Sequence, residues 1–186
     1  MIYPQGEQGH CSGYAIAYGI GKATGHFPVP DEVKAFYSHH DKGIEGMRII
    51  EIADLLRTEK LGGAHCTNWT KIYAKNAKTK LAKERNKFAM SKVHRALGTP
   101  GSAVLVSTKA KLTLDSKFYV KPNQDGEEHA LCMDSVITGK YFFINGFKFA
   151  NSWGEKWGDE GLFNVKKEDL LEFAEDIYVL TFEKAI

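Results

Sequence analysis

Apolar residues in the first half of the chain recur mainly at helical spacing. Those in 47–57 gather on one face of a helix, and Gly62-Gly63 follows them as a stop. The segment 11–22 has a similar pattern but contains three glycines, each of which costs up to about 1 kcal/mol against alanine in a helix. We therefore expect this helix to be held by burial, with its glycines permitting close backbone contact. A shorter helix is predicted at 31–37, after Pro30.

The second half changes to short apolar runs that are typical of strands. The run 103–106 is apolar and β-branched, which predicts a buried strand. Further strands are expected at 118–120, 129–133, 147–150, 161–165 and 177–182, and a hairpin joins 135–137 to 141–144 through a turn at 138–140. Helices followed by strands predict an α+β fold with two lobes in a single domain. We place a helical lobe at about 1–100 and a β lobe at about 101–186, with a substrate cleft between them.

Composition narrows the classes of function. The chain has 186 residues, of which 43% are hydrophobic and 26% charged, and this suits one folded domain. No apolar run is long enough to cross a membrane, and the first residues lack the pattern of a signal peptide. The net charge of +2 is too small to indicate a nucleic-acid partner. Three cysteines do not make a disulfide framework, so we expect a reducing compartment, or brief passage through an oxidising one.

The charge is unevenly distributed along the chain. Residues 69–100 hold nine Lys or Arg residues and one acidic residue, Glu84, so the remainder of the chain is net acidic. This stretch is predicted to form a basic helical hairpin, with helices at 70–88 and 90–97 and a stop at 98–101. Two interpretations stay open: a docking surface for an acidic partner, or a solvated helix face.

The candidate chemistry begins at Cys11, which opens a predicted helix directly after the glycine-containing stretch 5–10. The positive end of the helix dipole favours a thiolate over a thiol. His129 begins an apolar strand, and residues 151–161 combine Asn151 with two tryptophans and three glycines. The order Cys, His, Asn matches a nucleophile, its base and the group that orients the base.

With these motifs the sequence resembles the papain-like cysteine proteases over nearly its whole length. Gln5 lies six residues before Cys11, as a glutamine does in that family, and His129-Ala130 matches the family's His-Ala pair. The family's Asn-Ser-Trp-Gly signature is matched at 151–154, and the later tryptophan and glycines of the motif are also in place. In two respects the sequence departs from the pattern. Ser12 stands where a tryptophan usually follows the cysteine, and the disulfide cysteines of secreted papains are absent.

The resemblance implies a triad of Cys11, His129 and Asn151, with a thiolate–imidazolium pair as the resting form. Gln5 and the backbone N–H of Cys11 would form the oxyanion hole, and Trp153 would shield the His–Asn hydrogen bond from water. The implied substrate-binding residues are Gly9, His10, Gly46, Met47, Arg48, Glu128, Ala130 and Trp153. The charges of Arg48 and Glu128 would either select a polar or charged side chain or neutralise each other at the pocket rim. Neither a metal nor a cofactor is expected.

The implied function is a cysteine endopeptidase that cleaves protein substrates through a thioester acyl-enzyme. Two alternatives stay open: transamidation, deamidation or transpeptidation by the same thioester, and a papain-like scaffold retained for binding. The lack of disulfides, the lack of an inhibitory prosegment and the short lead-in before Cys11 suggest a domain of a larger protein that works in cytoplasm. Delivery into a target cell as a bacterial toxin or effector would require a separate inhibitor, or immunity protein, in the producing cell.

Overall fold

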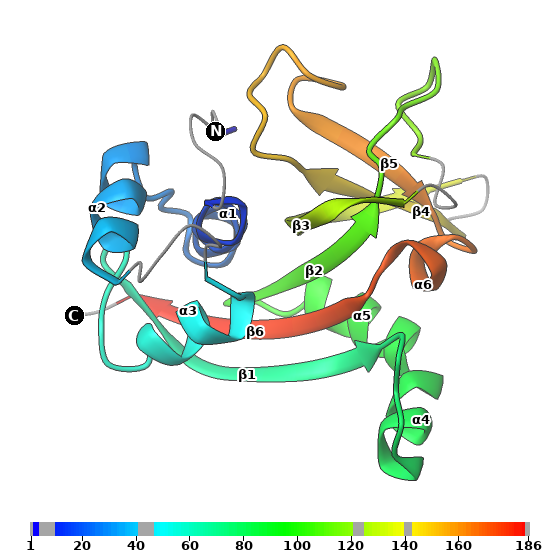
Figure 1. The fold of residues 1–186 in the computed structure, drawn as a ribbon, viewed down its shortest axis with the longest axis horizontal. Helices are drawn as coiled ribbons and strands as arrows, with labels where there is room; N and C mark the ends of the chain where they lie inside the picture. Colours follow the sequence, from blue (N-terminus) through cyan, green and yellow to red (C-terminus); the bar gives the residue numbers. More distant parts are fainter. Residues whose placement is uncertain (1, 4–9, 41–46, 121–124, 140–142, 185–186) are drawn as a thin grey trace.

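The structure is a computed structural model that describes residues 2–3, 10–40, 47–120, 125–139 and 143–184. The elements in these residues are α1 (Cys11–Thr24), α2 (Pro30–His40), α3 (Ile49–Leu55), β1 (Ala64–Ala74), α4 (Lys80–Lys87), α5 (Ala89–Leu97), β2 (Ser102–Ala110), β3 (Asp125–Thr138), β4 (Ile144–Ala150), β5 (Leu162–Lys166), α6 (Leu170–Phe173) and β6 (Asp176–Lys184) (Figure 1). The predicted α+β class is confirmed. None of the described helices has the length and apolar character needed to cross a membrane.

The strands form one antiparallel sheet in the order β1-β6-β2-β3-β4-β5. Figure 1 shows α1, α2 and α3 together on one side of the molecule, whereas α4 follows the end of β1 and projects away from the sheet. The long strand β3 includes both the 129–133 and the 135–137 segments that the sequence pattern divides into two strands. His129 therefore lies in a central strand of the sheet, and Asn151 follows the end of the neighbouring strand β4.

Each face of the central strands is covered by its own hydrophobic core. Ala103 and Leu105 of β2 pack in the core that contains α1, whereas Val104 and Val106 pack in a second core with α5 and α6. Successive side chains of a strand point to opposite faces. A strand that is covered on both sides therefore needs apolar residues throughout, which explains why the run 103–106 contains no polar residue.

Helix α1 is buried from Ser12 to Gly21, as its glycine-rich sequence predicted. A Cβ atom at Gly13 would lie 2.2 Å from the ring of Tyr37 in α2, and one at Gly21 would lie 2.1 Å from the ring of Phe27. The glycines therefore allow aromatic rings to pack directly against the helix backbone. Packing of this kind stabilises a helix whose own propensity is low.

The predicted helix at 70–88 was wrong in its first part. Residues up to Ala74 belong to β1, which pairs with β6, and only Lys80–Lys87 is helical. The pairing partner is about a hundred residues away in the chain, so a local pattern does not reveal it; contacts across the sheet override local propensity here. The predicted strand at 118–120 is also absent from the sheet, because Tyr119 and Val120 form only isolated bridges. Sheet structure thus extends into the region assigned to the helical lobe.

Candidate active site

The chain places Cys11 at the first residue of α1, against strand β3. The side chain is half-buried. Backbone groups of Ala130, Ser12 and Cys11 itself lie close enough to the sulfur to lower the pKa of the thiol. Because Ala130 directly follows His129, the sulfur lies next to the segment of β3 that carries the expected base.

His129 and Asn151 form the hydrogen bond that the motif order predicted. The ring Nε2 of His129 lies 2.8 Å from Oδ1 of Asn151, and the same oxygen accepts the backbone N–H of Ser152 at 2.8 Å. An amide oxygen can only accept, so Nε2 carries the proton, and in the neutral ring Nδ1 is the unprotonated nitrogen. Among the described residues, Nδ1 has no hydrogen-bond partner. It is therefore available to accept a proton.

Trp153 covers this hydrogen bond, as the resemblance implied. Its ring centroid lies 5.4 Å from that of His129, and the edge of Trp157 supports it at a centroid distance of 5.1 Å. His129 and Asn151 are 8% and 3% exposed, whereas Trp153 itself is 45% exposed. The tryptophan thus separates the imidazole–amide pair from solvent, and such exclusion of water strengthens the hydrogen bond.

Burial dominates the electrostatics of both reacting groups. It raises the pKa of the Cys11 thiol, and the hydrogen bonds from Ala130, Ser12 and Cys11 only partly lower it. It lowers the pKa of His129, against the smaller raising effect of the bond to Asn151. The start of α1 therefore favours the thiolate, as predicted, but by less than burial disfavours it. Burial thus disfavours the charged form of both groups, whereas the ion pair that the resemblance implies requires both charged forms.

Of the remaining expected residues, some lie outside the part of the chain that the structure describes, and His10 lies inside it. Gln5, Gly9 and Gly46 lie outside the described residues. His10 immediately precedes α1 and is half-buried against the ring of Tyr37, at a centroid distance of 4.6 Å.

Arg48, one of the expected specificity residues, also has a partner in its own helix. Arg48 forms a salt bridge with Glu51 at 2.8 Å, where both residues cap the start of α3. The hydrogen bond and charge of Glu51 raise the pKa of Arg48, and the charge of the exposed Glu128 raises it further. Burial raises the pKa of Tyr178, the nearby Asp176 and Glu128 carboxylates raise it further, and Arg48 lowers it. Tyr178 is thus close enough to feel the charges of both Arg48 and Glu128. The sequence did not indicate this residue, because a buried tyrosine in a strand resembles any core residue.

Ser12 and Met47 are joined in a way the sequence did not predict. The hydroxyl of Ser12 donates to the backbone carbonyl of Met47 and also contacts the hydroxyl of Tyr37. The segment expected to bind substrate is therefore tied directly to the first turn of α1.

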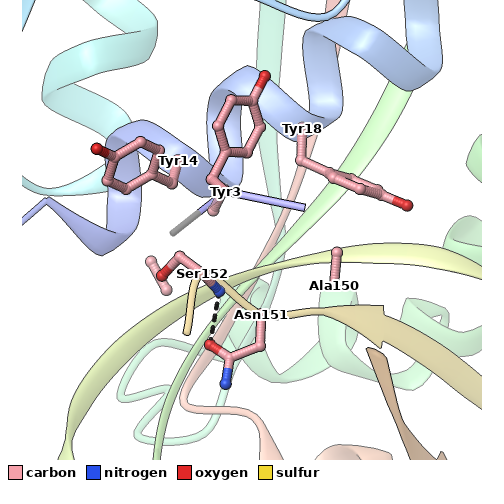
Figure 2. Close-up of a pocket in the computed structure, with 8 residues that line it drawn as sticks. Tyr3, Tyr14, Tyr18, Ala150, Asn151 and Ser152 are labelled. Carbon is pink, nitrogen blue, oxygen red and sulfur yellow. Dashed lines mark hydrogen bonds between the residues drawn. The ribbon is translucent and has the colours of Figure 1, made fainter. Parts of the chain in front are cut away.

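A small cavity lies behind the candidate site, between α1 and the end of β4 (Figure 2). Its volume is about 10 Å³, and its lining residues are Tyr3, Tyr14, Ala15, Tyr18, Ala130, Ala150, Asn151 and Ser152. In Figure 2, Asn151 and Ser152 lie across the cavity from the tyrosines. The space holds about one water molecule, so it is a gap in the packing and too small to bind a peptide.

The other cysteines are structural. Cys66 and Cys132 are buried in the core that contains α1. Among the described residues, no group of three or more His, Cys, Asp or Glu side chains is placed to hold a metal ion.

No family model matches the sequence, and no curated protein matches it. The structure, however, has the fold of the papain-like cysteine proteases. It is similar to bromelain from Ananas comosus in complex with the E64 inhibitor, with a TM-score of 0.63 and 14% identity, covering 98% of this chain and 93% of bromelain. It is similar to the Carica candamarcensis protease CMS1MS2 in complex with E-64, with a TM-score of 0.59 and 12% identity over 97% and 92% of the two chains. Xylellain from Xylella fastidiosa gives a TM-score of 0.58 and 16% identity over 97% and 82%. The TM-scores and coverages establish the fold. Because the sequence identities are low, the function must be argued from the site.

Proposed function

We propose that the protein is a cysteine endopeptidase that cleaves protein substrates with Cys11 as nucleophile, His129 as base and Asn151 as the residue that orients the base. The observation that supports this most directly is the shielded hydrogen bond between His129 Nε2 and Asn151 Oδ1. That bond leaves Nδ1 free on the residue next to Ala130, whose backbone contacts the Cys11 sulfur.

In the proposed reaction, Cys11 Sγ attacks the scissile carbonyl carbon while its proton passes to Nδ1 of His129. Because burial disfavours the charged form of both groups, this proton transfer is placed together with the attack. The backbone N–H of Cys11 and the Gln5 side chain would stabilise the developing oxyanion. His129 then returns the proton to the leaving amine, the C–N bond breaks, and a thioester remains.

Hydrolysis of the thioester completes the cycle. His129 removes a proton from a water molecule, the water oxygen attacks the thioester carbon, and the C–S bond breaks. The proton on His129 returns to the sulfur, and a carboxylic acid is released. An amine in place of this water would give transamidation or transpeptidation by the same steps.

The test compares the wild-type protein with Cys11→Ala on a fluorescently labelled protein substrate. The wild type should release peptides, and Cys11→Ala should reduce release to background. Cys132→Ala is the matched control, because it removes a buried cysteine from the core and should keep activity as long as the protein folds. Hydrolysis by purified Cys11→Ala would overturn the proposal. Mass spectrometry of the products separates acids, formed with water, from amides, formed with an amine.

We further propose that the protein acts as a bacterial toxin or effector in the cytoplasm of a target cell, held in check by a separate inhibitor in the producing cell. All three cysteines are free, which suits a reducing compartment. Expression of the wild type inside a bacterium should slow growth, and expression of Cys11→Ala should not. Equal growth of the two strains would contradict the proposal.

A further inference from the structure

The ring and hydroxyl of Tyr37 contact the residues on both sides of Cys11. The tyrosine is fully buried in α2. Its ring packs on that of His10. Its hydroxyl oxygen lies 2.5 Å from Oγ of Ser12 and accepts the backbone N–H of Gly13 at 3.2 Å. One side chain from a different helix thus holds the residue before the nucleophile and the two residues after it.

The protons in this cluster can be assigned. Ser12 donates its single hydroxyl proton to the carbonyl of Met47, so the contact between the two hydroxyls must use the proton of Tyr37. Burial raises the pKa of Tyr37 to about 12, so that proton is present at neutral pH. The bonds therefore run in one direction, from Gly13 N–H to Tyr37, from Tyr37 to Ser12 and from Ser12 to Met47. Each hydroxyl is satisfied as both donor and acceptor.

The cluster supplies a cap that α1 otherwise lacks. In most helices the side chain preceding the first turn accepts an N–H of the second or third residue. His10 occupies that position and makes no such bond, whereas Tyr37 accepts the N–H of Gly13, the third helical residue. The backbone of Ser12 remains close to the sulfur, where it lowers the pKa of the thiol. Gly13 must lack a side chain for this, because a Cβ there would lie 2.2 Å from the tyrosine ring.

We propose that Tyr37, acting through Ser12 and Gly13, is a positioning residue for the nucleophile. It fixes the first turn of α1, so that the N–H of Ser12 stabilises the thiolate as it forms and the N–H of Cys11 stays in place for the oxyanion. Ser12 extends the same network to Met47 and so aligns the adjacent segment with the sulfur. The kinetic part of this proposal rests on the proposed function. The part that concerns the reactivity of the thiol does not.

The test uses Tyr37→Phe, which keeps the ring and removes the hydroxyl. The rate of Cys11 alkylation by iodoacetamide is followed against pH by mass spectrometry, and its midpoint should move to higher pH than in the wild type. On a peptide substrate, kcat should fall by about 10- to 100-fold with little change in KM, because misplacement affects the reacting atoms. Ser12→Ala should act in the same direction, and Ser12→Thr, which keeps the hydroxyl, should recover part of the rate.

Tyr73→Phe is the matched control. It also removes a buried hydroxyl, one that donates to the Leu171 carbonyl at 2.7 Å, but in the second core. It should lower the melting temperature without changing the alkylation profile or kcat. If Tyr37→Phe behaves as Tyr73→Phe does in both assays, the positioning role is wrong. If the wild type has no peptidase activity, the proposed function fails, and the alkylation profiles still decide the role of Tyr37.

Discussion

Helices α1 and α4 form for opposite reasons. Helix α1 contains three glycines, yet it is buried from Ser12 to Gly21 and held by rings from neighbouring segments. Helix α4 consists mostly of strong helix formers, is capped by the Thr79 side chain, and has no buried residue. Contacts from the rest of the molecule therefore fix the helix that carries Cys11, whereas local propensity maintains the basic helix. The candidate site therefore depends on contacts with segments that are distant from Cys11 in the sequence.

Helix α4 also contains features that do not serve its own stability. Lys80 and Lys83 lie in its first turn with no acidic residue, where the helix dipole disfavours positive charge. Leu81 and Phe88 are 80% and 59% exposed. These features are compatible with a docking surface and with a solvated helix face, and substitution of the lysines by glutamate distinguishes the two.

The reactivity of thiols should separate the two regions most strongly. Because burial raises the pKa of Cys11, its alkylation by iodoacetamide should still be rising at pH 9, by about tenfold per pH unit below the pKa. A cysteine introduced on α4 by Lys83→Cys, at an exposed site, should have a lower midpoint close to that of an ordinary thiol. Site-resolved mass spectrometry measures both in one sample.

A different outcome would indicate a resting ion pair. If Cys11 reacts at its full rate already at pH 6, the attraction between thiolate and imidazolium exceeds the effect of burial. The proton would then reside on His129 before the attack, although the roles of Cys11 and His129 would stand. His129→Gln should in that case move the midpoint to higher pH.

The packing of Tyr37 on α1 can be tested by Gly13→Ala. Alanine raises helix propensity by up to about 1 kcal/mol, but its Cβ would lie 2.2 Å from the ring of Tyr37. Overpacking of this kind costs about 1–3 kcal/mol, so we expect a net loss of stability in urea unfolding. Gly98→Ala is the control, because its Cβ would meet its nearest neighbour, the Arg95 carbonyl, at 3.7 Å. A more stable Gly13→Ala would mean that the ring can move aside.

The candidate site could be predicted from sequence wherever one motif held the information. Asn151 and Trp153 belong to a single short signature, and the structure brings both to His129. Tyr37 and Tyr178 could not be predicted, because each acts through residues from distant segments. Within an amphipathic helix or strand, such a tyrosine has the pattern of an ordinary core residue.

The fold shows the same limit. The run 103–106 was predicted as a strand because it is short, apolar and β-branched, and it is buried throughout. Residues 70–74 were predicted as the start of the first helix of the basic hairpin, yet they pair with β6. A strand whose partner lies about a hundred residues away is specified by that partner, and pairing of this kind leaves little local signal.

Replacing the basic residues of α4 should have a smaller effect than the changes tested at Cys11 and Gly13 of α1. Lys80→Glu, Lys83→Glu and Lys87→Glu together should lower kcat/KM for an acidic protein substrate by a few fold at low salt, because steering by the basic surface is lost. The effect should disappear at about 1 M salt. The control changes the exposed Lys109, Lys111 and Lys117 to Glu, which alters net charge equally. Equal losses in both triple variants would leave only an effect of net charge and would support the solvated-face interpretation.

The smallest effect is expected from Leu81→Ala. This side chain is 80% exposed, so its removal gives up little buried area, and alanine is the better helix former. The free energy of unfolding should therefore change by less than about 0.5 kcal/mol. Ile16→Ala, at a fully buried position of α1, should instead cost about 2–5 kcal/mol. A large loss from Leu81→Ala would show that α4 packs against a surface in solution, for example that of a second copy, and concentration-dependent sedimentation would then identify the contact.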